Sequence, residues 1–76
     1  MRTFEYVITE PEGLHALPAT ALVEKLNKYA SAIMASFNGN TVNAKSPFGL
    51  MSLGAHHGDV ITFTIVGEDE DEVAIN

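Results

Sequence analysis

Residues 32–44, AIMASFNGNTVNA, have the pattern of two strands joined by a tight turn. Residues 32–37 and 41–44 supply apolar and β-branched side chains, and Asn38 and Gly39 lie between them. An Asn-Gly pair accommodates the positive φ angles of a two-residue hairpin turn. We therefore predict an antiparallel β-hairpin in the middle of the chain.

Two outer segments have the same strand-like alternation. Residues 3–9 alternate around Phe4, Tyr6 and Ile8. Residues 60–66 place apolar side chains on one face and two threonines on the other. Since strand side chains point to opposite faces in turn, each segment predicts a strand with one buried face.

Two helices are expected between the strands. From Ala16 onward the apolar residues follow helical spacing, which predicts a buried stripe. Ser46 and Pro47 suit the N-cap and first position of a short second helix, which ends near Leu53, before Gly54. The stripe on the first helix comprises Ala19, Leu22, Val23, Leu26 and Ala30.

The resulting order, β-α-β-β-α-β-α, predicts an α+β fold. We expect a four-stranded, mainly antiparallel sheet with the helices packed on one face and the other face open to solvent. With 76 residues, the chain is expected to form one domain over 1–76, with a short C-terminal helix. In that region Val73 and Ile75 would have to cover the end of the sheet.

The acidic residues are concentrated near the C-terminus. The formal net charge is −6, and five of the ten acids lie in the run from Glu68 to Glu72. We expect this run to open a brief helix from about Asp69, because carboxylates are favourable at a helix N-terminus. An acidic interaction tail is the alternative.

Composition excludes several classes of function. Without cysteine there is no disulfide, thiol nucleophile or zinc–thiolate site. With only four lysines and arginines, the chain lacks a nucleic-acid footprint. No apolar run approaches the ~20 residues of a membrane span, and no signal peptide is evident, so we expect no membrane insertion and a cytoplasmic location.

His15 is the candidate reactive residue. It precedes the first helix, where backbone N–H groups lack intrahelical partners and the helix dipole is positive. If His15 carried a phosphoryl group, the N–H groups of Ala16 and Leu17 would bind its oxygens. The alternative is a histidine that only fills a near-cap position.

Two separate motifs resemble one known family. They are Gly13-Leu14-His15-Ala16 with Pro18-Ala19, and Val42-Asn43-Ala44-Lys45-Ser46 followed by Gly49-Leu50-Met51-Ser52-Leu53. In this order and spacing they resemble HPr, the histidine-containing phosphocarriers of the bacterial sugar phosphotransferase system. The resemblance implies an open-faced β-sandwich without a metal or organic cofactor. It also implies that His15 accepts a phosphoryl group from enzyme I and passes it to IIA domains of sugar permeases.

Leu17 departs from the family pattern, which usually has arginine there. That guanidinium would pair with phosphoryl oxygens, and a charge-assisted hydrogen bond contributes about 1.5–3 kcal/mol. Its loss would slow transfer roughly ten- to a hundredfold. Leu17 also falls on the polar face of the first helix, so we expect it to be exposed.

Ser46 matches a second family site, at which a kinase phosphorylates many HPr proteins and turns the carrier into a regulator. The resemblance thus implies a serine kinase and a transcriptional regulator as further partners. The alternative is that Ser46 only caps its helix. Pro47 replaces the usual aliphatic residue and would stiffen this site.

A docking surface is implied by the same resemblance. Phe48 and Met51 could instead be ordinary core residues, and we expect Phe48 to be partly exposed. The expected docking residues are Leu17, Thr20, Pro47, Phe48 and Met51.

The adjacent His56 and His57 raise the question of a metal site. Neither a cysteine nor a suitably spaced third histidine supports one, so we expect a solvated turn and no metal. Three functions follow from the sequence. The first is a phosphocarrier; the second is a regulatory module acting through Ser46 with weak transfer at His15; the third is a plain ligand-binding domain.

Overall fold

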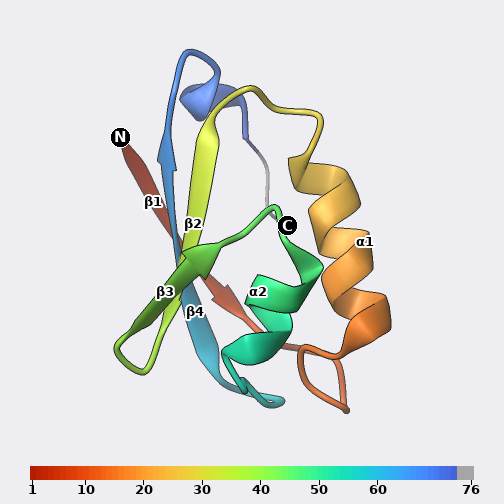
Figure 1. The fold of residues 1–76 in the computed structure, drawn as a ribbon. Helices are drawn as coiled ribbons and strands as arrows, with labels where there is room; N and C mark the ends of the chain where they lie inside the picture. Colours follow the sequence, from red (N-terminus) through yellow and green to blue (C-terminus); the bar gives the residue numbers. More distant parts are fainter. Residues whose placement is uncertain (74–76) are drawn as a thin grey trace.

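Four strands form one antiparallel sheet in the order β1-β4-β2-β3, and two helices cover one of its faces (Figure 1). This arrangement, seen in a computed structural model that describes residues 1–73, confirms the predicted α+β class. No helix in that range is long and apolar enough to cross a membrane. The elements are β1 (Arg2–Val7), α1 (Ala16–Leu26), β2 (Ala32–Phe37), β3 (Asn40–Asn43), α2 (Pro47–Ser52), β4 (Val60–Val66) and the 3-10 turn η1 (Glu70–Glu72).

The core lies between the sheet and the helices. Alternate residues of β2 and β4 point towards it, as the period of two requires, and Phe63 at its centre is fully buried. The Tyr6 ring meets the Phe63 ring edge to face, with centroids 6.1 Å apart. The main buried contributors are Ile33, Ala35, Ile61, Phe63 and Ile65 from the sheet, and Ala19, Leu22, Val23, Leu26 and Leu50 from the helices.

Local turn chemistry behaves as the sequence predicts. Asn38 and Gly39 have φ angles of 52° and 83°, and they connect β2 to β3. The Ser46 side chain caps α2 by accepting a hydrogen bond from the Gly49 N–H at 3.2 Å. Gly54, with φ of 68°, follows α2 in the left-handed conformation typical of a helix end.

The prediction of the apolar stripe was wrong for one residue, Ala30. Helix α1 ends at Leu26, and Ala30 is exposed beyond it. The N–H of Ala30 donates instead to Oδ2 of Asp69 at 2.8 Å, so a long-range contact takes it out of the helix. Two strand limits also differ: β1 stops at Val7, and β3 covers Asn40–Asn43.

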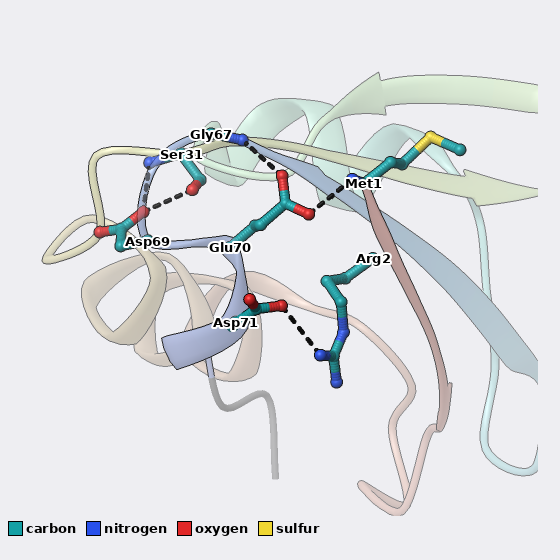
Figure 2. A network of polar contacts seen from close by, with 7 residues as sticks. All are labelled: Met1, Arg2, Ser31, Gly67, Asp69, Glu70 and Asp71. Carbon is teal, nitrogen blue, oxygen red and sulfur yellow. Dashed lines mark hydrogen bonds and ion pairs between the residues drawn. The ribbon is translucent and has the colours of Figure 1, made fainter.

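The acidic run forms a 3-10 turn that holds two other segments (Figure 2). Asp69 accepts hydrogen bonds from the N–H and hydroxyl of Ser31, just before β2. Glu70 contacts the amino group of Met1 at 2.5 Å and accepts from the N–H of Gly67 at 3.1 Å. We call this set, together with the Arg2–Asp71 ion pair described below, the C-terminal clamp.

The clamp revises the sequence interpretation of these acids. Arg2 and Asp71 form an ion pair of 2.9 Å. Within residues 1–73, three of the five acids in the run therefore have hydrogen-bond or ion-pair partners. A three-residue turn has little dipole, and the carboxylates act through specific contacts rather than by starting a helix. Val73 is buried as expected, whereas Ile75 lies outside the described residues.

Candidate functional site

His15 occupies the N-cap of α1. Its backbone is extended, with φ of −87° and ψ of −173°, and its carbonyl accepts the first helical hydrogen bond from Ala19 at 2.9 Å. The imidazole makes no capping hydrogen bond and is exposed. The ring is therefore free to react with an incoming group.

Two backbone donors of α1 are free beside this ring. Ala16 and Leu17 are the first two helical residues, and their N–H groups have no hydrogen-bond partner within residues 1–73. Pro18 follows and has no N–H to satisfy. The first turn thus presents two N–H groups and the positive end of the helix dipole, which together suit an anion.

The loop before His15 is fixed by a close backbone approach. Gly13 has φ of +80°, and a Cβ built on it would lie 2.7 Å from the Ala55 carbonyl oxygen. The same oxygen accepts a hydrogen bond from the Leu14 N–H at 3.2 Å. Because only glycine fits this approach, the loop that ends in His15 is held against the segment after α2.

A hollow of about 180 Å³ lies beside His15. This is far more than the roughly 10–15 Å³ that admits one water molecule. Met51 of α2 contributes to its wall, because α1 and α2 pack side by side. The lining residues are Glu12, Leu14, His15, Met51, Gly54, Ala55 and His56.

Three of the five expected docking residues are exposed. Leu17 and Phe48 are 85% and 80% exposed, which is unusual for large apolar side chains, and Thr20 is also exposed. Pro47 and Met51 are half-buried. The prediction of an exposed Phe48 is confirmed, as is that of Leu17.

Ser46 lies outside the hollow at His15, at the opposite end of α2 from Met51. It is half-buried, and its hydroxyl is already used as the helix cap. The structural role of Ser46 is therefore confirmed. Its role as a phosphorylation site stays a prediction.

The segment with His56 and His57 forms an exposed turn, as expected. Among residues 1–73, no group of three or more histidines and acids is arranged to hold a metal ion. Glu12 and His56, which line the hollow with His15, were not predicted from the sequence. For His56 no local pattern signals this, because it joins the lining only when the turn after α2 returns to the loop before α1.

The sheet order, the two helices on one face and the histidine at the N-terminus of α1 define the class of protein: a small α+β domain of the open-faced β-sandwich type. The family model described as the PTS HPr component phosphorylation site matches residues 2–76. The chain therefore belongs to the HPr family of the phosphotransferase system.

Individual relatives agree with this assignment. The chain is 46% identical over 63 residues to the phosphocarrier protein HPr of Buchnera aphidicola, covering 83% of this chain and 74% of that protein. It matches the crystal structure of HPr-C-His from Thermoanaerobacter tengcongensis with a TM-score of 0.89 and 38% identity, over 96% and 82% of the two chains. It also matches Crh, the catabolite repression protein of Bacillus subtilis, with a TM-score of 0.76 and 37% identity, over 96% and 84%.

Proposed function

We propose that His15 carries a phosphoryl group, which it receives from enzyme I and passes to IIA domains of sugar permeases. The observation that carries this proposal is the exposed imidazole beside the two unpaired N–H groups of Ala16 and Leu17. Membership of the HPr family supports the same chemistry. The proposal places the carrier in the cytoplasm.

The transfer would proceed through a ring nitrogen of His15, which in the family is Nδ1. This nitrogen forms a bond to phosphorus while the bond between phosphorus and the donor breaks. The phosphoryl oxygens then accept hydrogen bonds from the free N–H groups of the first turn. Passing the group on reverses these changes, with an acceptor in place of the donor.

The docking surface would consist of the exposed apolar side chains near the two helices. Leu17, Thr20 and Phe48 are exposed, and Pro47 and Met51 are accessible in part. Apolar side chains at a protein–protein interface favour binding because their surface is removed from water. Leu17 adds apolar area but removes the charge that the family's arginine usually supplies.

The direct test is intact-mass analysis after incubation with phosphoenolpyruvate and a matched enzyme I. We expect one acid-labile phosphoryl group, absent from His15→Ala and present in His57→Ala, which removes an exposed histidine outside the hollow. A folded wild-type protein that stays unlabelled over a long incubation would contradict the carrier function.

A second candidate is a regulatory module that acts through Ser46 and the docking surface, with weak transfer at His15. Leu17 favours it, since no guanidinium is present at that position. Similarity to Crh, described as a catabolite repression protein, supports it as well. Its test is incubation with ATP and an HPr serine kinase. Acid-stable phosphate lost in Ser46→Ala is the expected result, and a transcriptional regulator would be the partner of that form.

A further inference from the structure

Three of the four lysine and arginine side chains have contacts far from His15. Arg2 is paired in the C-terminal clamp, at the end of the molecule far from the start of α1 (Figure 1). Lys45 donates to the Tyr29 carbonyl at 2.6 Å, just beyond the other end of α1. Lys28 lies over the Tyr29 ring, 5.4 Å from its centroid. None of these three can reach a phosphoryl group on His15.

The fourth cation, Lys25, lines a different hollow together with Tyr6 and Glu10, between α1 and β1. The hollow at His15 is lined by an acidic residue instead, Glu12. A phosphoryl group would bring up to two negative charges into this hollow. The only side chain of its lining that can become cationic, apart from His15 itself, is His56.

The position of His56 is set by its own turn. Its backbone N–H donates to Oδ2 of Asp59 at 2.8 Å, and its Nδ1 lies 3.8 Å from the same oxygen. Gly13 approaches the Cα of His56 so closely that an added Cβ would lie 3.1 Å from it. The backbone of His56 is thus fixed beside the loop of His15.

The imidazole of His56 remains adjustable. It is 84% exposed, so no packing holds the ring away from the hollow. Nδ1 is the ring nitrogen beside the Asp59 carboxylate, so Nε2 is available to a second partner. A ring protonated on both nitrogens would donate from Nε2 to a phosphoryl oxygen while Nδ1 faces Asp59.

We propose that His56 is a phosphate-pairing residue: its imidazolium pairs with the phosphoryl group on His15 and supplies the positive charge that Leu17 lacks. This proposal rests on the proposed function of His15. The titratable residues that line the same hollow as His56 are His15 and Glu12, and Asp59 lies beside it within the turn. His57 is adjacent in sequence but does not line the hollow.

The test uses phosphoramidate, a small phosphoryl donor that needs no protein partner. A His15 ring nitrogen forms a bond to phosphorus, the bond from phosphorus to the amide nitrogen breaks, and ammonia leaves. The species labelled once, on His15, is purified by anion exchange and its site verified by fragment mass. The protonation of each histidine ring is then followed between pH 6 and 8.5 by ¹⁵N NMR.

We expect phosphorylation of His15 to raise the pH at which His56 loses its proton by about half a unit or more, as charges a few ångströms apart near a surface require. His57 is the matched control, and the pH at which it loses its proton should change much less. Equal movement of both rings, or none, would overturn the proposal, because a general change of net charge would then explain the result.

Linkage provides a second measurement, since two groups that stabilise each other do so reciprocally. By ³¹P NMR, the phosphoryl group on His15 should lose its second proton at lower pH in the wild type than in His56→Gln. His57→Gln should match the wild type, and identical titrations in all three proteins would contradict the proposal. Failure of enzyme I to label His15 bears only on the proposed function, because phosphoramidate labelling does not depend on it.

Discussion

The carbonyl oxygen of Ala55 occupies the space that a side chain at Gly13 would need, at 2.7 Å from an ideal Cβ. Gly13→Ala should therefore lower the free energy of unfolding by about 2 kcal/mol or more, through left-handed strain and overpacking together. The displaced loop should also slow the labelling of His15. Denaturant unfolding and the labelling rate measure the two effects.

Gly58→Ala provides the matched control for this prediction. Gly58 has a similar φ of +88°, but a Cβ there would meet nothing within 4 Å. We expect a loss of about 1–2 kcal/mol from backbone strain and an unchanged labelling rate. If both variants labelled at the wild-type rate, the close approach at Ala55 would not be what positions His15.

Leu17→Arg should increase the rate of phosphoryl transfer to His15 about ten- to a hundredfold, because a guanidinium would pair with the transferring group. Leu17 is 85% exposed, so the change should leave the fold intact. Leu17→Gln, which is polar but uncharged, should stay near the wild-type rate. Rapid-quench assays with enzyme I measure the two rates, and equal rates for both variants would show that the missing charge does not limit transfer.

Ser46→Ala should lower the free energy of unfolding by about 1 kcal/mol, because the Gly49 N–H loses its cap. Ser46→Asp should retain most of that stability, since a carboxylate caps the helix and suits its dipole. Ser52→Ala is the control within the same helix, where the hydroxyl only donates to the Gly49 carbonyl. Thermal unfolding of the three variants measures whether Ser46→Ala is the least stable of them, as the loss of the cap predicts.

Asp69→Asn should destabilise the fold at neutral pH and much less in acid. The Ser31 hydroxyl, followed by the Ala30 and Ser31 N–H groups, lowers the pKa of Asp69 below its ordinary 3.8. A lowered folded-state pKa contributes stability above pH 4, and this contribution is lost as the pH falls through the folded value. The stability gap between wild type and variant should thus narrow between pH 5 and 2.

Glu68→Gln is the control for the clamp, since Glu68 is exposed and has no partner in the part of the chain that the structure describes. We expect its stability to parallel that of the wild type at each pH. A gap for Asp69→Asn that stayed constant down to pH 2 would show that the carboxylate charge is not what holds Ser31.

Elements with local causes were predictable from the sequence. The Asn38-Gly39 turn and the Ser46 cap depend on residues within a few positions, and both were confirmed. The end of α1 was not predictable in this way. Ala30 continues the apolar spacing, but its N–H donates a hydrogen bond to Asp69, 39 residues away. Contacts at such separation leave no periodic signal in the sequence.

The site around His15 likewise has one part that the sequence predicts and one that it does not. The free N–H groups beside His15 follow from its place at a helix start, which the helical spacing of apolar residues from Ala16 onward predicts. The hollow does not follow from the sequence, since Met51 and His56 join its lining only when α2 and the turn after it have folded back. Tertiary approach therefore creates the part of the site that the sequence analysis missed.

The open face of the sheet can be used to attach the protein to a surface. Both helices lie on the opposite side (Figure 1), and the chain has no cysteine, so a single introduced thiol would be chemically unique. Ala32 is exposed on β2, and its side chain points away from the core because that of the next residue, Ile33, is buried. Ala32→Cys would allow immobilisation on a sensor surface in one orientation, with the His15 side directed to the solution and accessible to every arriving partner.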